Sequence, residues 1–100
     1  MSNQLQPFPI DNYFISRELG VGAFGMVHLY ELMEKYESDE DNPSVVAVKA
    51  FKSQHYFEVE VEKLEILSHN ELLQHPNFVK IYGCCFMGNL FGIVMEKWTF

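Results

Sequence analysis

The sequence predicts an α+β fold in which a five-stranded antiparallel sheet carries one large helix. Five short runs are rich in β-branched and aromatic residues, and turn-forming residues separate several of them. Only the stretch that follows Ser53 repeats its apolar residues with the spacing of a helix. Because that stretch follows the third run, the expected order is three strands, one helix and two strands.

Length and composition limit the classes of protein that this chain can form. Its 100 residues, 48% of them hydrophobic and 15% aromatic, suffice for one small domain. A net charge of −7 argues against binding to the phosphates of nucleic acid or to an anionic membrane surface. No apolar run is long enough to span a membrane, and residues 1–10 lack the features of a signal peptide.

The cysteines and histidines predict neither disulfides nor a metal site. Cys84 and Cys85 are adjacent and cannot join separate segments, so an intracellular, cytoplasmic location is expected. Their side chains should alternate across a strand. His75 is expected to fix a turn, and no metal-ligand spacing is present among the histidines: His28, His55, His69 and His75.

The first half of the chain is expected to form a leader, two strands and an acidic loop. Residues 1–10 are polar, contain two prolines and are predicted to be a loose leader. Residues 13–19 and 26–30 have the composition of strands, and the glycine-rich segment 20–25 lies between them. Residues 34–44 are acidic and carry an Asn-Pro turn signal, which predicts a solvated connection.

The middle of the chain is predicted to form a buried strand and then the helix. Residues Val45–Phe51 are mostly apolar, as in a central strand, and Ser53 can cap a helix that extends to about Leu73. Glu60 lies inside the apolar stripe of this helix, where a carboxylate is costly unless it finds a cation or donor. The apolar members of the stripe are Phe57, Val61, Leu64, Leu67 and Leu72.

The last quarter of the chain is expected to form a hairpin. Residues 75–77 (His-Pro-Asn) end the helix, since proline cannot continue it. Strands are predicted over residues 78–82 and 90–95, with a tight turn over residues 87–89 (Met-Gly-Asn). The aromatic side chains of this region are expected in the core: Tyr82, Phe86 and Phe91.

The glycine-rich segment has the spacing G-x-G-x-x-G, which two kinds of phosphate-binding loop share. A dinucleotide-binding loop opens a helix, whereas the residues after Gly25 alternate like a strand. A loop between two antiparallel strands can instead fold over phosphates and offer them its backbone amides, with Phe24 excluding water. A glycine-rich hairpin without a ligand is the competing interpretation.

Lys49 favours the phosphate-binding interpretation. It interrupts an apolar strand, where a lysine needs anions nearby. A bound phosphate and the Glu60 carboxylate would supply those anions.

Taken together, these features resemble the amino-terminal lobe of eukaryotic protein kinases. Residues 20–27 are similar to the glycine-rich loop of that family, and residues 46–49 (Val-Ala-Val-Lys) to the strand with the ATP-orienting lysine. Residues 57–61 are similar to the helix whose glutamate pairs with that lysine. Residues 75–77 resemble the turn after that helix, and residues 93–98 the last strand entering the hinge.

The resemblance covers residues 11–100 and implies catalytic and phosphate-binding roles. Lys49 would contact the α- and β-phosphates of ATP, and Glu60 would hold Lys49 in place. The loop residues implied in phosphate binding are Gly20, Val21, Gly22, Ala23, Phe24 and Gly25.

The resemblance also implies an adenine pocket. Val27 and Ala47 would cover the base, and Met95 would be the gatekeeper at the back of the pocket. The backbone carbonyl of Glu96 and the amide of Trp98 would bind the adenine edge. Two residues would belong to the apolar spine that joins the lobes of a kinase: Leu64 and Ile81.

Two other glutamates compete with Glu60 for Lys49. The separation of Glu60 from Lys49, eleven residues, is shorter than is usual in the family, and Glu65 fits the usual spacing better. The family has a leucine four residues after the glutamate, and Leu64 follows Glu60 at that distance. We therefore assign the pair to Glu60, with Glu65 and Glu62 as the alternatives.

The family carries its remaining catalytic groups in a carboxy-terminal lobe. These are an aspartate that orients the substrate hydroxyl and the residues that hold Mg²⁺. This chain is expected to end at the hinge, so alone it should not transfer phosphate. The complete enzyme would transfer the γ-phosphoryl group of MgATP to a protein Ser/Thr or Tyr hydroxyl, and the sequence leaves that choice open. The alternative is a non-catalytic lobe that docks on another chain through an exposed apolar face.

Overall fold

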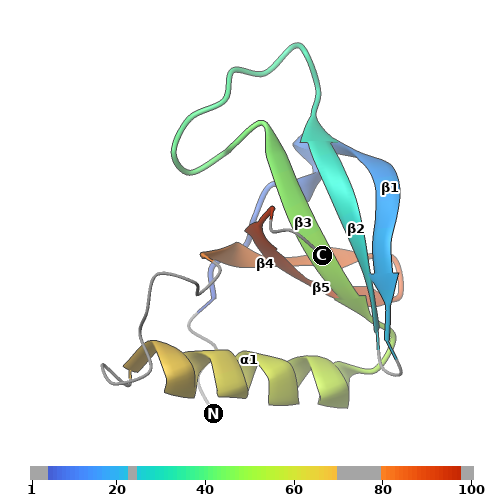
Figure 1. Ribbon diagram of the computed structural model, residues 1–100, viewed down its shortest axis with the longest axis vertical. Coiled ribbons are helices and arrows are strands. Elements are labelled where there is room, and N and C mark those ends of the chain that lie inside the picture. The colour runs from blue at the N-terminus through green and yellow to red at the C-terminus, as the bar shows by residue number, and fades with distance from the viewer. Residues whose placement is uncertain (1–4, 23–24, 70–79, 98–100) are drawn as a thin grey trace.

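The computed structural model describes residues 5–22, 25–69 and 80–97. Its five strands form one antiparallel sheet in the order β1-β2-β3-β5-β4, and one α-helix lies below it (Figure 1). The predicted fold class and order of elements are confirmed. The elements are a 3-10 turn η1 (Ile10–Asn12), β1 (Tyr13–Val21), β2 (Gly25–Leu32), β3 (Val45–Phe51), α1 (Gln54–His69), β4 (Ile81–Met87) and β5 (Leu90–Glu96).

Strand β3 is the central strand of the sheet, and it pairs with β2 on one side and with β5 on the other. Successive side chains of a strand point to opposite faces, so β3 contributes to two clusters. The far-side cluster consists of Phe8, Ile10, Tyr13, Val46, Val48, Cys85 and Val94. The helix-side cluster consists of Phe51, Phe57, Val61, Cys84 and Ile93. Cys84 and Cys85 therefore lie on opposite faces, as predicted.

Helix α1 begins where the sequence predicts. The Ser53 hydroxyl accepts a hydrogen bond from the amide of Tyr56 (3.4 Å), and the Ser53 carbonyl accepts one from the amide of Phe57 (3.1 Å). These bonds satisfy amide groups that the first turn of a helix leaves free. The described helix ends at His69, and its expected end near Leu73 lies outside the described residues.

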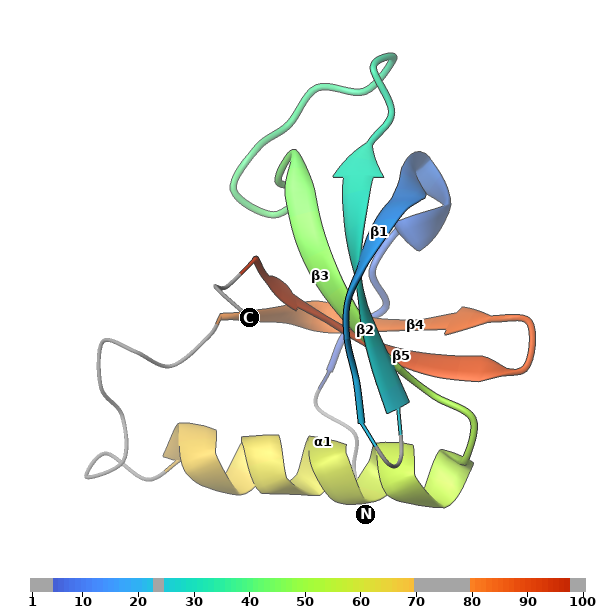
Figure 2. The ribbon, with the colours of Figure 1, turned by 45° about the vertical axis from the view of Figure 1, so that its right-hand side comes forward.

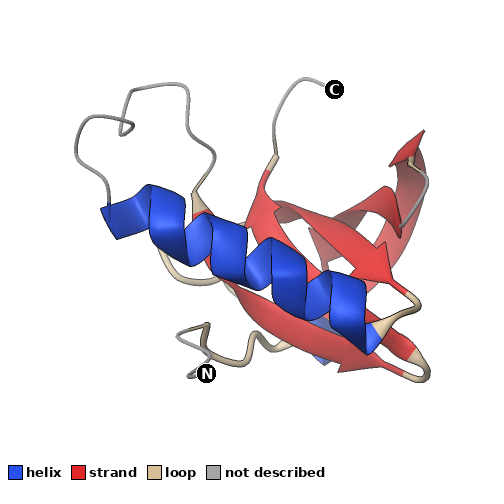
Figure 3. Ribbon diagram, turned by 90° about the horizontal axis from the view of Figure 1, so that it is seen from below, coloured by secondary structure: helices blue, strands red, loops and turns tan. Residues whose placement is uncertain are grey.

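The apolar stripe of α1 packs on the sheet (Figure 3). Phe57 and Val61 are 3% and 1% exposed, and Leu64 packs against them as a half-buried side chain. The Phe57 ring lies 5.7 Å from that of Phe91 on β5. The other two predicted members of the stripe, the Leu67 side chain and Leu72, lie outside the described part of the chain.

The hairpin of β4 and β5 differs from the prediction at its first strand. β4 covers residues 81–87, whereas a strand was predicted over residues 78–82. The pairing continues to the tight turn, because Phe86 pairs with Phe91 and Gly88 takes a positive φ of 61°. The expectation that Phe86 is a core residue is wrong: its ring packs at the rim of the helix-side cluster on an edge strand and is 60% exposed.

The predicted loose leader is wrong for residues 5–10, which pack along the edge of β4. The Phe8 amide donates to the Cys84 carbonyl (2.8 Å), and the Cys84 amide donates to the Gln6 carbonyl (2.9 Å). Phe8 and Ile10 are each only 7% exposed, because their side chains complete the far-side cluster. Polarity and proline content, the basis for the prediction, do not reveal these two apolar anchors.

The approach of the amino-terminal segment requires glycine at position 83. A Cβ atom at Gly83 would collide with the carbonyl oxygen of Gln6 and would lie 3.4 Å from the Phe8 side chain. We therefore expect Gly83→Ala to lower the free energy of unfolding by about 1–3 kcal/mol, measured by urea denaturation. Gly20→Ala is the control, because no atom lies within 4 Å of a Cβ atom there. Equal effects of the two substitutions would show that the segment does not pack as described.

The acidic loop between β2 and β3 arches away from α1 at the opposite end of the sheet (Figure 2). Asp39 Oδ1 accepts hydrogen bonds from the amides of Asp41 (2.9 Å) and Asn42 (2.8 Å), which organises the exposed turn. The Tyr13 hydroxyl donates to the Pro43 carbonyl and ties the loop to β1. The predicted solvated connection is confirmed.

Tyr13 gives the fold a measurable pH dependence. Burial, together with the nearby charges of Asp39 and Tyr82, raises the pKa of Tyr13 from 10.0 to about 12. A raised pKa means that its contribution to stability is complete below pH 10 and is lost as the pH rises toward 12. We expect this loss to be roughly 2 kcal/mol, measured by denaturation at pH 9 and pH 12. Tyr13→Phe should show a correspondingly smaller loss, and an identical loss would contradict the assignment.

Candidate functional site

The predicted pair of Lys49 and Glu60 forms in the structure. Lys49 Nζ on β3 lies 3.4 Å from Glu60 Oε2 on α1. Both side chains are part-buried, with exposed fractions of 35% and 29%. Of the alternatives, the Glu62 side chain is exposed, and the Glu65 side chain lies outside the described part of the chain.

Local structure fixes the positions of both partners. Lys49 follows Val48 in β3, so it points to the face that α1 covers. Its ammonium group lies 5.4 Å from the centre of the buried Phe51 ring, a cation–π distance. On α1, Glu60 lies between the buried anchors Phe57 and Val61, which hold that part of the helix against the sheet.

The ion pair faces a cleft of about 500 Å³ between the β1–β2 turn and helix α1. Two lysines and one glutamate are the charged side chains among the described residues that line it, in a chain whose net charge is −7. The cleft therefore favours an anionic ligand. Its described lining residues are Gly20, Val21, Gly22, Gly25, Val27, Lys49, Phe51, Tyr56, Val59, Glu60 and Lys63.

The glycine-rich turn forms one wall of this cleft. The Gly22 amide donates to the Gly25 carbonyl (2.7 Å), which closes the turn. A Cβ atom on Gly20 would meet no atom within 4 Å, and one on Gly22 would meet only the Gly25 carbonyl oxygen at 3.6 Å. The packing of the protein itself thus leaves open the space beside Gly20 and Gly22. Such space would let an anionic group approach the backbone of the turn.

Gly25 has a different role. A Cβ atom there would lie 2.5 Å from the Ala50 carbonyl oxygen. The close approach of β2 to β3 therefore requires a glycine at this position, whatever the ligand.

Several predicted adenine-site residues do not line the described cleft. Ala47 is fully buried, and Met95 is half-buried against the helix-side cluster. The Glu96 carboxylate accepts a hydrogen bond from the Lys80 amide (3.3 Å) at the far end of β5. Of the remaining predicted residues, Val27 lines the cleft, while Ala23, Phe24 and Trp98 lie outside the described residues. The predicted spine residues, Leu64 and Ile81, both pack against the helix-side cluster.

Sequence reasoning missed four cleft residues. Tyr56, Val59 and Lys63 on α1 line the cleft with Glu60, and Phe51 lines it from β3. The helical residues are spaced i, i+3, i+4 and i+7, the signature of one helix face. A helical wheel drawn around Glu60, rather than around the apolar stripe, would have placed these three helical residues on one face with Glu60, but only the assembled fold shows that this face lines a cleft.

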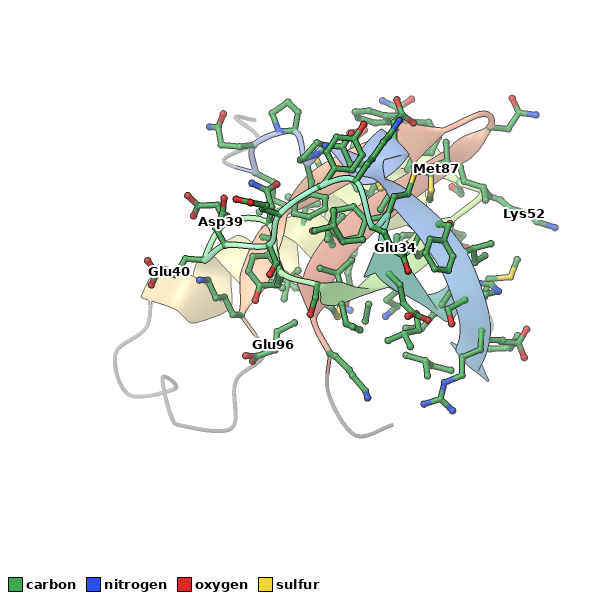
Figure 4. The ribbon with its side chains drawn as sticks, turned by 90° about the horizontal axis from the view of Figure 1, so that it is seen from above. Glu34, Asp39, Glu40, Lys52, Met87 and Glu96 are labelled. Carbon is green, nitrogen blue, oxygen red and sulfur yellow. The ribbon has the colours of Figure 1, made fainter. Side chains whose placement is uncertain are left out.

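The described residues do not form a magnesium site. Glu60 is the single carboxylate among the described cleft residues, and it is bound to Lys49. No three His, Cys, Asp or Glu side chains within residues 5–22, 25–69 and 80–97 gather as metal ligands. Viewed from above, Asp39 and Glu40 of the acidic loop lie on the opposite side of the molecule from Lys52, which precedes α1 (Figure 4). Neither Asp39 nor Glu40 is among the residues that line the cleft.

Comparison with known proteins identifies the family. Residues 14–99 match the family model of protein tyrosine and serine/threonine kinases. The chain is 38% identical over 88 residues to a probable LRR receptor-like serine/threonine-protein kinase of Arabidopsis thaliana. It is 39% identical over 97 residues to the macrophage colony-stimulating factor 1 receptor of Danio rerio, and 36% identical over 88 residues to Aurora kinase B of Mus musculus. The chain belongs to the protein kinase family.

These matches cover most of this chain but a small part of each relative. They cover 86%, 94% and 82% of the chain, in the order given, and 8%, 10% and 22% of the relatives. The family resemblance that the sequence motifs predicted is therefore confirmed.

Within the described residues, no helix is both long enough and apolar enough to cross a membrane.

The ion pair should contribute little to stability, since both partners are about one-third exposed. We expect Glu60→Gln to change the free energy of unfolding by less than about 1 kcal/mol. Val61→Ala, at the next position, should cost about 2 kcal/mol, because the Val61 side chain is 1% exposed. Urea denaturation of both variants measures these two free energies of unfolding. A larger loss of stability for Glu60→Gln than for Val61→Ala would show that the ion pair has a structural role.

Proposed function

We propose that this chain forms the ATP-binding lobe of a protein kinase. The observation that carries the proposal is the Lys49–Glu60 ion pair, with its Nζ–Oε2 distance of 3.4 Å, in a cleft walled by the glycine-rich turn. In the complete enzyme, this lobe would hold MgATP while the γ-phosphoryl group is transferred to a hydroxyl group of a protein substrate.

Each cleft residue has a distinct part in the proposed binding mode. The backbone of Gly20 and Gly22 meets the phosphates, since a Cβ atom at either position would meet nothing closer than the Gly25 carbonyl oxygen, at 3.6 Å from Gly22. Lys49 contributes a compact positive charge to the α- and β-phosphates. The Glu60 carboxylate orients Lys49 and offsets its charge when the cleft is empty. Val27 on β2 also lines the cleft and offers an apolar surface to the adenine.

The other adenine contacts in the proposal come from the family resemblance. Ala47 would complete the apolar cover of the base, and Met95 would close the back of the pocket. The Glu96 carbonyl and the Trp98 amide would bind the adenine edge. Ala47 is 0% exposed, so adenine binding at this position requires a rearrangement that uncovers it.

Catalysis in the proposal needs groups beyond those described. Mg²⁺ would neutralise charge on the transferring phosphoryl group, and its ligands would come from a carboxy-terminal lobe. The residues of this chain bind and orient the nucleotide, so the 100-residue polypeptide alone should show no phosphoryl transfer. An intracellular location accompanies this proposal, because the cell interior supplies ATP and keeps thiols reduced, and both Cys84 and Cys85 are free.

Replacement of Lys49 tests the proposal directly. We expect Lys49→Ala to weaken binding of a fluorescent ATP analogue at least about tenfold, because a charge-assisted contact to phosphate is lost. Lys35→Ala is the control for the loss of one positive charge, since the exposed Lys35 lies in the loop beyond β2 and contacts the Tyr36 ring. Equal affinities of wild type and Lys49→Ala would refute nucleotide binding at this cleft and favour the docking module.

A further inference from the structure

The geometry points to a second phosphate-binding cation in the cleft. We propose that Lys63 contacts the terminal phosphoryl groups of the nucleotide, while Lys49 contacts the inner ones. This inference rests on the proposed function and deepens it, because it assigns a residue that selects the triphosphate. Neither the sequence motifs nor the family resemblance singled out Lys63.

Lys63 lies on the face of α1 that lines the cleft. Glu60 and Lys63 both line the cleft, together with Tyr56 and Val59 of the same helix face. Lys63 follows Glu60 by three residues, or about 4.5 Å along the helix axis. A lysine side chain has four methylene groups, so its ammonium group can reach across that distance. The cleft thus presents two ammonium groups to one elongated anion.

The two lysines of the cleft differ in how far their positive charges are offset. Glu60 is bound to Lys49, so the positive charge of Lys49 is largely offset before a ligand arrives. Among the described side chains, no carboxylate lies within 4.0 Å of Lys63 as an ion-pair partner, and its side chain is exposed. Lys63 is therefore the unbalanced positive charge of the described cleft lining. An anion in the cleft therefore gains attraction from this charge in addition to the contribution of Lys49.

Selectivity for phosphate number follows from the arrangement. A nucleoside monophosphate can occupy the glycine-rich turn and Lys49 without extending toward Lys63. A triphosphate carries more negative charge and extends further, so it can reach both lysines. Removing the charge at position 63 should therefore weaken ATP binding and leave AMP binding nearly unchanged.

The test is calorimetric titration of the 100-residue chain with ATP, ADP and AMP, without Mg²⁺. Lys63→Gln should lower the affinity for ATP about 3- to 5-fold and that for AMP less than about 1.5-fold, since a solvent-exposed ionic contact contributes up to about 1 kcal/mol. Lys63→Arg should keep the preference for ATP, because it retains the charge. Lys35→Gln is the matched control: Lys35 is also exposed, and it lies in the loop beyond β2, where it contacts the Tyr36 ring.

The outcomes separate this inference from the proposed function. If Lys63→Gln lowers the affinities for ATP and AMP equally, or leaves both unchanged, the role of Lys63 is refuted, although nucleotide binding through Lys49 stands. If wild-type protein binds none of the three nucleotides, both proposals fail. The thermal midpoint of Lys63→Gln should equal that of wild type, since the side chain is exposed. A lower midpoint together with weaker binding of AMP would attribute the change to the fold, and would also overturn the inference.

Discussion

The pairing of β3 with neighbours on both edges is the constraint on which the site depends. A strand held between β2 and β5 cannot shift its register by one residue without exchanging its two faces. Val46 and Val48, which are 0% and 1% exposed, fix one face in the core. Lys49 must then point to the face that α1 covers. The position of the lysine is therefore a consequence of apolar packing on the opposite face of the sheet.

Helix α1 is positioned by the same kind of interaction. Phe57 and Val61 bury almost all of their surface against the sheet, whereas Lys49 and Glu60 each keep about a third of their side chains exposed. An ion pair in that environment adds little stability. Two neighbouring sets of residues on α1 therefore have different roles. The buried Phe57 and Val61 stabilise the position of the helix, whereas Glu60 adds little stability and orients Lys49.

The two edges of the sheet are protected in different ways. Residues 5–8 pair with β4 and cover part of its edge, so the amino-terminal segment extends the sheet and closes the far-side cluster. Strand β1 is the opposite edge, and its register with β2 shifts between Ile15 and Arg17 and between Glu18 and Gly20. Such bulges interrupt the regular ladder that another strand would need for pairing. The second bulge also lies where β1 enters the glycine-rich turn.

The sequence by itself determined the order of elements, the central position of β3 and the choice of Glu60, because apolar composition, helical periodicity and the Ser53 cap are local signals. Tertiary structure alone decided three features. It packed residues 5–10 on β4, it left Phe86 exposed at an edge, and it brought Lys63 to the cleft. Each of these depends on which surfaces meet in space. The hydrophobic pattern of the sequence indicates which side chains can be buried. Whether a given side chain is buried depends on which residues of the folded sheet and helix pack against it.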